Sequence, residues 1–270
     1  MKVSQGCAQA RDGISLGYTL HGDARASRRA VLVHSLAMDR HFWDPLAERL
    51  GRDAAVLSLD CRGHGASGAG SGEYSVALFA DDLAALMDHV GWDRALVAGA
   101  SMGGCVSLAF GQRYPARVAG LGLIDTTAWY GEQAPQQWEE RARKALDGGL
   151  QALVEFQVTR WFSEAFRAAH PEVVSASVAV FLRNDPRAYA ASCRMLGAAD
   201  LRPALGSIRV PAAVLVGEED YATPITMAQM LHRSIGGSTL TVLKNARHLT
   251  PLERPDEIAA ELNRLFDKAT

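Results

Sequence analysis

Short apolar runs recur along the chain and alternate with segments whose apolar residues repeat at helical spacing. The beginning differs, because residues 3–21 alternate around Asp12-Gly13 and predict a β-hairpin. The later runs are continuous, as in strands buried on both faces, and lie at 30–33, 55–59, 95–98, 118–124, 212–216 and 239–243. Helical spacing fills most of the intervals, as at 75–90 and 256–266. Regular alternation of strand and helix predicts an α/β fold.

The predicted fold is a mostly parallel, doubly wound sheet of eight strands with an N-terminal antiparallel hairpin. The alternation stops between residues 127 and 205, where all periodic segments are helical and lie at 138–146, 150–162, 173–182 and 189–196. Sheets of this kind bind ligands at the carboxyl ends of their strands. We therefore expect residues 127–205 to form a helical cap over a core domain of residues 1–126 and 206–270. An interaction surface is the alternative use of this segment.

Composition and charge narrow the classes of partner. The 270 residues are 48% hydrophobic and 21% charged, as in globular proteins, and a net charge of −2 favours neither nucleic acid nor an anionic membrane. The N-terminus lacks an apolar signal core, and no apolar run reaches membrane-spanning length. The cysteines are scattered without metal-ligand spacing: Cys7, Cys61, Cys105 and Cys193. We expect a cytoplasmic protein with free thiols, no metal or other cofactor, and no nucleic-acid or membrane partner; a homo-oligomer stays open.

A serine stands between a predicted strand and a predicted helix, in Gly99-Ala100-Ser101-Met102-Gly103. In that context Gly-x-Ser-x-Gly is typical of a nucleophile elbow. The glycines have a steric explanation, because a turn this sharp brings backbone against the positions two residues before and after Ser101. The N–H groups at the start of the following helix would stabilise negative charge at Ser101. A purely structural turn is the alternative.

A serine nucleophile needs a base within hydrogen-bond reach and an acid that orients the base. In this topology the chain order is serine, acid, histidine. Most histidines precede Ser101, whereas His248 follows the last predicted strand and is our candidate base. The candidate acid is Asp220, which comes shortly after the strand at 212–216. Asp125 is its rival, because it also follows a strand.

Two backbone N–H groups are the expected donors to the oxyanion that forms during acyl transfer. Met102 supplies one, as the residue after the nucleophile, and Leu36 supplies the other, from the loop after the strand at 30–33. A simple connecting loop is the alternative for residues 34–38. The glycine-rich segment 60–67 lacks the pattern of a phosphate-binding loop, so we expect a structural turn beside the site.

Together these residues resemble the α/β-hydrolase superfamily along essentially the whole chain, and within it they are similar to the 3-oxoadipate enol-lactonases. The likeness to the lactonases lies in His34-Ser35-Leu36 ahead of Trp43-Asp44-Pro45, Asp60-Cys61-Arg62-Gly63-His64-Gly65, Trp138 with Arg141, Arg160-Trp161-Phe162, Tyr189-Ala190 with Cys193, and Asp200-Leu201-Arg202. Those enzymes usually carry Ser-Leu-Gly in the oxyanion loop, where this chain has Ser35-Leu36-Ala37. The departure bears on the substrate and not on the reaction type.

The resemblance implies hydrolysis of a small carboxylate-bearing enol-lactone, such as 3-oxoadipate enol-lactone, in the catabolism of aromatic compounds. Such a substrate needs an apolar pocket, for which Trp138, Trp161 and Met102 are candidates. It also needs a cation, for which Arg141 or Arg160 is the candidate; both are equally interpretable as solvated charges. The alternatives are a broad-specificity carboxylesterase and a C–C bond hydrolase of ring-cleavage products. A ligand-sensing protein with this fold is the alternative from another class.

Overall fold

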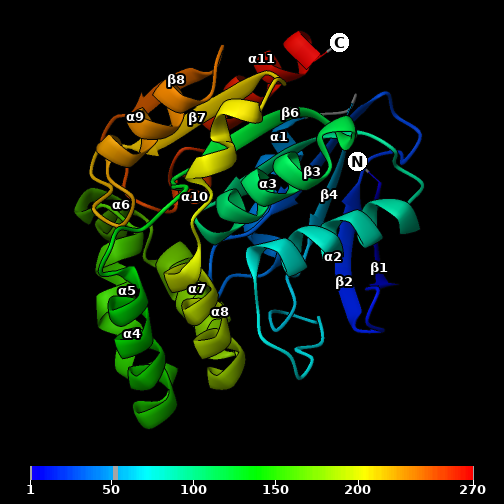
Figure 1. Ribbon diagram of the computed structural model, residues 1–270. Helices are drawn as coiled ribbons and strands as arrows, with labels where there is room; N and C mark the ends of the chain where they lie inside the picture. The colour runs from blue at the N-terminus through cyan, green and yellow to red at the C-terminus, as the bar shows by residue number, and fades with distance from the viewer. Residues whose placement is uncertain (1, 51–53, 270) are drawn as a thin grey trace.

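The computed structural model describes residues 2–50 and 54–269. They contain an eight-stranded sheet with the order β1-β2-β4-β3-β5-β6-β7-β8 (Figure 1). The strands are β1 (Val3–Gln9), β2 (Ser15–His21), β3 (Arg28–Val33), β4 (Ala54–Leu59), β5 (Ala95–Ala100), β6 (Val118–Ile124), β7 (Ala212–Gly217) and β8 (Thr239–Leu243). β2 pairs antiparallel with β1 and β4, and all pairs from β4 onward to β8 are parallel. The predicted sheet is confirmed.

Burial accounts for the continuous apolar runs. Every residue of β4, β5 and β7 is buried, because helices cover both faces of the parallel part of the sheet. The N-terminal hairpin turns at Asp12-Gly13 as predicted, with the Gly13 N–H donating to the Ala10 carbonyl (2.9 Å). Gly13 has a φ of +82°, a conformation that glycine adopts without steric cost.

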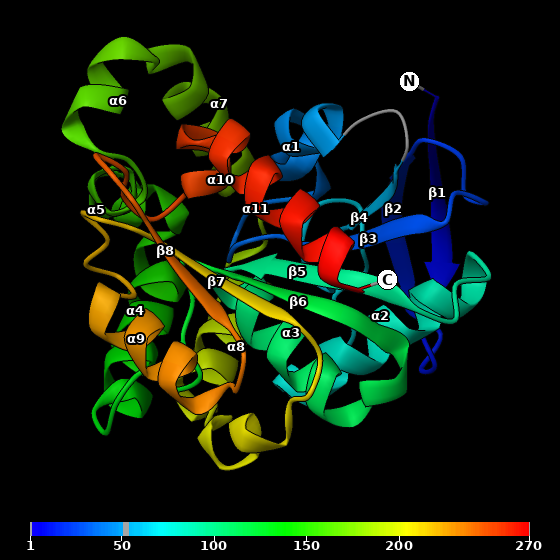
Figure 2. The ribbon, with the colours of Figure 1, turned by 90° about the horizontal axis from the view of Figure 1, so that it is seen from above.

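Helices outside the β6–β7 connection cover the sheet, and they are α1 (Asp44–Leu50), α2 (Val76–His89), α3 (Met102–Arg113), α9 (Ile225–Ser234), α10 (Thr250–Glu253) and α11 (Pro255–Ala269). α11 packs on β5, β6, β7 and α1, whereas α3 packs on β3, β5, β6 and α2. Figure 2 shows α1 and α11 on one face of the sheet and α2 and α3 on the other. The doubly wound arrangement follows.

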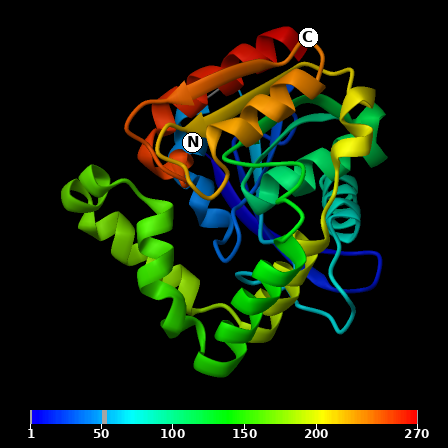
Figure 3. The same cartoon turned by 60° about the vertical axis from the view of Figure 1, so that its left-hand side comes forward.

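The connection from β6 to β7, residues 125–211, is called the helical insertion below; it is described throughout and contains no strand. Its α-helices are α4 (Ala134–Gly148), α5 (Val154–Trp161), α6 (Glu164–Ala169), α7 (Pro171–Leu182) and α8 (Pro186–Ala198). α4 packs along α8, and the group projects away from the sheet as a separate layer (Figure 3). The insertion begins at the carboxyl end of β6, where the sequence analysis places a cap.

One predicted helix is wrong in its extent. The segment 150–162 is a 3₁₀-helix, η3 (Leu150–Leu153), followed by α5, and the short α6 was not predicted. Ser163 starts α6 by accepting a hydrogen bond from the Phe166 N–H (3.2 Å), and Pro171 starts α7. η3 and α6 are too short for their apolar residues to show a helical repeat in the sequence. Among the described helices, none has the length and apolar character that crossing a membrane requires.

The two ends of the helical insertion are fastened to each other. Trp129 and Asp200 form an isolated antiparallel bridge, and the Leu201 N–H donates to the Ala128 carbonyl (2.8 Å). The Arg202 guanidinium pairs with Asp200 (2.7 Å) and lies 3.5 Å from the centroid of the Trp129 ring. The segment Asp200-Leu201-Arg202, part of the resemblance to the lactonases, therefore has a structural role where the two ends of the helical insertion meet.

Candidate active site

The turn between β5 and α3 places Ser101 at the carboxyl edge of the sheet in a strained conformation, with φ +53° and ψ −114°. Its two neighbouring glycines are sterically required. A Cβ atom on Gly99 would overlap the Gly103 carbonyl, and one on Gly103 would overlap the Val33 carbonyl. The interpretation of this motif as a sharp strand-to-helix turn is thus explained at the atomic level.

Three side chains from separate loops form one hydrogen-bonded chain. The Ser101 Oγ lies 2.9 Å from His248 Nε2, and His248 Nδ1 lies 2.8 Å from Asp220 Oδ2. All three residues are buried, with exposed fractions of 6% or less. Nδ1–H donating to the carboxylate leaves Nε2 free to accept the serine proton. This is the arrangement that activates a serine for attack on a carbonyl carbon.

The segment after β7 supplies hydrogen-bond donors that orient the Asp220 carboxylate. Its Oδ1 accepts hydrogen bonds from the N–H groups of Ala222 (2.7 Å) and Thr223 (3.0 Å), and its Oδ2 accepts one from the Thr223 hydroxyl (2.8 Å). These donors fix the carboxylate with one oxygen directed at His248. The sequence Asp-x-x-Thr in a turn was a usable sign of this, which the sequence analysis missed.

The rival acid Asp125 occupies a different place. Its Oδ1 accepts from the Gly217 N–H (3.1 Å), and its Oδ2 accepts from the N–H (3.0 Å) and hydroxyl (2.6 Å) of Thr250. Burial, helped by the nearby Asp220 carboxylate, raises the pKa of Asp125 well above its usual value. Asp125 therefore fastens the end of β6 to β7 and to the segment just after His248.

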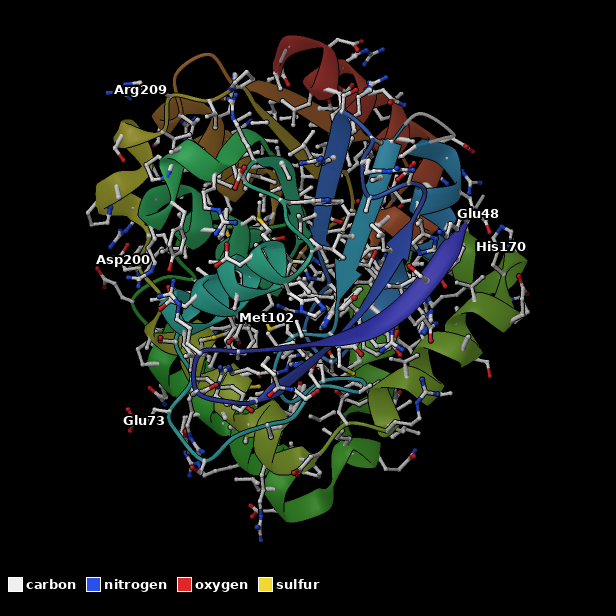
Figure 4. The ribbon with its side chains drawn as sticks, turned by 90° about the vertical axis from the view of Figure 1, so that its right-hand side faces the viewer. Glu48, Glu73, Met102, His170, Asp200 and Arg209 are labelled. Carbon is white, nitrogen blue, oxygen red and sulfur yellow. The ribbon has the colours of Figure 1, made fainter. Side chains whose placement is uncertain are left out.

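The expected oxyanion donors flank the elbow serine. Met102 is the first residue of α3, and Leu36 lines the cavity beside the serine. His34 fixes the loop that carries Leu36, since its Nδ1 lies 2.8 Å from the Ser35 carbonyl and its Nε2 accepts from the Cys61 N–H (3.0 Å). The glycine-rich segment 60–67 thus supports this loop from behind. The Met102 side chain is fully buried, and Figure 4 labels Met102 near the middle of the view.

Ala37, which stands where the lactonases usually carry glycine, lies in a turn whose backbone conformation favours glycine. The Met38 N–H donates to the Ser35 carbonyl (3.1 Å), and Ala37, the third residue of this turn, has a φ of +61°. Turns with positive φ at that position favour glycine. Asn184 of the helical insertion holds the turn, donating from Nδ2 to the Ala37 carbonyl (2.9 Å).

The loop that carries His248 is bonded to the helical insertion. The Trp161 carbonyl accepts from the N–H groups of His248 and Leu249, both at 3.0 Å. The buried Glu253 carboxylate accepts from the N–H (3.1 Å) and hydroxyl (2.9 Å) of Ser163, and burial raises its pKa. The position of the imidazole therefore depends on contacts made by the insertion.

Two adjacent spaces that share part of their lining lie near Ser101. The inner cavity, which Ser101 and Trp161 line, has a volume of about 10 Å³, and the outer chamber beside it has a volume of about 520 Å³. Four side chains line both spaces, so they lie where the spaces meet and are called the throat below: Tyr130, Trp138, Arg141 and Arg160. The predicted pocket residues are brought together, with one correction. The Met102 side chain is fully buried in the core and lies outside both linings.

Among the described residues, the two throat arginines have no acidic partner. Arg141 donates to the Tyr189 hydroxyl (2.7 Å) and the Gln157 side-chain carbonyl (2.8 Å), both neutral groups. No carboxylate of residues 2–50 and 54–269 lies within ion-pair distance of Arg141 or Arg160. Burial and the nearby Arg141 lower the pKa of Arg160 to about 10. The throat is therefore a half-buried cationic site suited to an anion.

Sequence reasoning missed several residues around the nucleophile, namely Tyr130, Gln157, Thr223 and Asn184, and it named Tyr189 only as part of the resemblance, without a role in the site. They come from loops and helix faces that the chain brings together only through folding. Within residues 2–50 and 54–269, no cluster of three or more histidine, cysteine or acidic side chains is placed to bind a metal ion.

A family model described as "alpha/beta hydrolase fold" matches residues 31–255. The chain is 32% identical to 3-oxoadipate enol-lactonase 2 of Acinetobacter baylyi over 243 residues, which is 90% of this chain and 89% of the relative.

Solved structures give similar results. An enol-lactonase from Burkholderia xenovorans superimposes with a TM-score of 0.92 at 32% identity, over 97% of this chain and 100% of the other. A thermophilic esterase from Thermogutta terrifontis gives a TM-score of 0.90 at 28% identity, over 100% and 99%. Since the family model and these full-length similarities agree with the sheet order and the elbow, the chain belongs to the alpha/beta hydrolase fold family.

Proposed function

We propose that this α/β hydrolase is a serine esterase or lactonase for small substrates that carry a carboxylate, with 3-oxoadipate enol-lactone as the first candidate. The observation that carries the reaction class is the hydrogen-bonded chain from Ser101 through His248 to Asp220. The lactonases similar to this chain in sequence and in structure support the choice of substrate.

In the proposed reaction, the Ser101 Oγ attacks the ester carbonyl carbon while His248 Nε2 takes the hydroxyl proton. Asp220 stabilises the imidazolium, and the N–H groups of Leu36 and Met102 donate to the oxyanion. Collapse breaks the C–O bond, and the leaving oxygen takes the proton from His248. In an enol-lactone this oxygen stays tethered and the enol becomes a ketone. Water then attacks the acyl carbonyl carbon while His248 takes its proton, and the bond to Ser101 breaks as His248 returns that proton to the Oγ, which releases the acid.

We assign the substrate carboxylate to Arg141 and Arg160. A guanidinium presents two parallel N–H donors that match a carboxylate, and charge-assisted hydrogen bonds strengthen where water is excluded. Trp138 and Trp161 supply the apolar walls beside them. On this assignment residues 127–205 act as a cap over the core formed by residues 1–126 and 206–270, because the cap provides both arginines.

A panel of purified substrates tests this function: 3-oxoadipate enol-lactone, a neutral lactone of similar ring size, a nitrophenyl acetate and a C–C ring-cleavage product. We expect turnover of the esters and lactones, the highest kcat/KM for the anionic lactone, and no activity in Ser101→Ala. Turnover confined to the ring-cleavage product would assign C–C hydrolysis instead. Ligand binding without turnover of any substrate would overturn the enzyme assignment in favour of a sensor.

A further inference from the structure

The outer chamber is much larger than the space at the nucleophile. Its floor is the throat, one side comes from α4 and α5, and the other comes from the segment after β7 and the start of α9. Figures 1 and 2 both place α4 and α5 on the same side of the molecule as α9. The chamber of about 520 Å³ is within the range of small-molecule sites, whereas the inner cavity of about 10 Å³ admits about one water.

The small volume of the inner cavity limits where an ester substrate can lie. The inner cavity has room for little beyond the reacting group, so the remainder of the substrate extends through the throat. The alcohol portion also has to depart after acylation, and the chamber lies directly beyond the throat residues Tyr130 and Arg160. The chamber is thus on the path of the leaving group.

Aromatic rings stand on the two sides of this chamber. Phe156 of α5 is 45% exposed and Tyr221, after β7, is 51% exposed, and both are among the few large apolar side chains of the described residues with so much exposed surface. The Arg160 guanidinium lies between them, 5.5 Å from the Phe156 ring centroid and 5.9 Å from that of Tyr221. Ala222, Pro224 and Met227 continue the apolar side.

We propose that the outer chamber is a leaving-group subsite that binds an aromatic ring between Phe156 and Tyr221. Besides the lactone proposed above, the substrate class then includes monoesters whose acid part carries a carboxylate and whose alcohol part carries an aryl group. An aromatic ring gains from edge or offset contact with the two side chains and from the adjacent guanidinium. The ester C–O bond breaks, and the aryl alcohol departs with the proton that His248 returns. This inference rests on the proposed function.

Three monoesters of succinic acid test the subsite, with methyl, benzyl and cyclohexylmethyl alcohols. All three give the same acyl-enzyme, so differences in kcat/KM report acylation and leaving-group binding. After correction for their alkaline hydrolysis rates, we expect the benzyl ester to exceed the methyl ester about tenfold, with the cyclohexylmethyl ester between them.

The double variant Phe156→Ala/Tyr221→Ala should lower the benzyl-to-methyl ratio about tenfold. The ratio is independent of the folded fraction, because both esters are measured on one preparation. Leu182→Ala is the matched control, since Leu182 is a 39% exposed apolar side chain on α7 outside the chamber lining, and it should keep the wild-type ratio.

Equal corrected kcat/KM values for benzyl and methyl esters in the wild type, or a ratio unchanged by the double variant, would overturn the subsite and leave the proposed function standing. Failure of the wild type to hydrolyse any of the three monoesters, together with hydrolysis of neutral esters, would instead overturn the carboxylate assignment on which the subsite rests.

Discussion

The active site has two ends that differ in how their charged groups are paired. We call the end around Asp220 and His248 the satisfied end, because the chain itself supplies its hydrogen-bond partners. We call the end around Arg141 and Arg160 the unsatisfied end, because the described residues supply it with no carboxylate. Around Asp220, each carboxylate oxygen has at least two donors from the chain itself, and the imidazole of His248 is bonded at both nitrogens. Around Arg141 and Arg160, positive charge is half-buried with no carboxylate of the described residues in ion-pair contact.

We interpret the satisfied end as the part that carries out the reaction and the unsatisfied end as the part that binds the substrate. A buried charge is costly unless it is paired, so a fold keeps an unpaired cation only where something else compensates it. The Ser101–His248–Asp220 chain is complete in the free protein, which suits a reaction that begins as soon as the carbonyl arrives. The throat is completed from outside, and we assign that missing partner to the substrate.

The largest expected effect is at the satisfied end. Asp220→Asn keeps the shape but presents the wrong hydrogen-bonding group to His248 Nδ1, so kcat should fall about 10⁴-fold. Stopped-flow or steady-state assay with a nitrophenyl ester measures this. Asp125→Asn is the matched control: it should reduce the melting temperature, because it disturbs contacts with Gly217 and Thr250, and cost far less in kcat. The reverse order of kcat losses would make Asp125 the catalytic acid.

At the unsatisfied end the expected effect is smaller and depends on the substrate. Arg160→Met should lower kcat/KM about 10²-fold for a carboxylate-bearing ester and less than about threefold for a neutral ester, because only the anion loses a charge-assisted partner. Arg194→Met, which removes a surface pair with Glu139, should leave both substrates unaffected. Equal losses on both esters in Arg160→Met would give Arg160 a structural role only.

The contact between Glu253 and Ser163, which joins the His248 loop to the helical insertion, should make the stability of the protein depend on pH. Burial raises the pKa of Glu253 above its usual 4.5, so folding favours its neutral form. Its contribution is fully present below pH 4.5 and is lost as the pH rises through the raised pKa. Urea unfolding from pH 4 upward should therefore show wild type losing stability relative to Glu253→Gln. Parallel curves for the two proteins would refute this account of Glu253.

The sequence predicts which residues meet at the satisfied end of the site. Strands buried on both faces leave long apolar runs, and the elbow needs glycine at positions 99 and 103 for steric reasons, so local pattern and order locate Ser101, Asp220 and His248. The sequence favoured Asp220 as the acid but left Asp125 as a rival. Both follow strands, and only the turn through Thr223 directs one of them to the imidazole.

The unsatisfied end was predicted only in outline. Trp138, Arg141, Arg160 and Trp161 came from the resemblance to the lactonases, and the division of 150–162 into short elements escaped the apolar pattern. Tyr130 lies in a loop with no periodicity, and its place at the throat depends on how the helical insertion returns over the sheet. Such side chains meet through tertiary packing, which local spacing does not encode.

The central claim, that Ser101 is the nucleophile of a serine hydrolase, is tested most directly by covalent labelling. A fluorophosphonate added in excess should increase the intact mass of the wild type by a single adduct, and peptide mapping should place it on Ser101. Ser101→Ala should remain unlabelled, and Asp220→Asn should react far more slowly. Equal labelling of wild type and Ser101→Ala, or an adduct on another residue, would contradict the account.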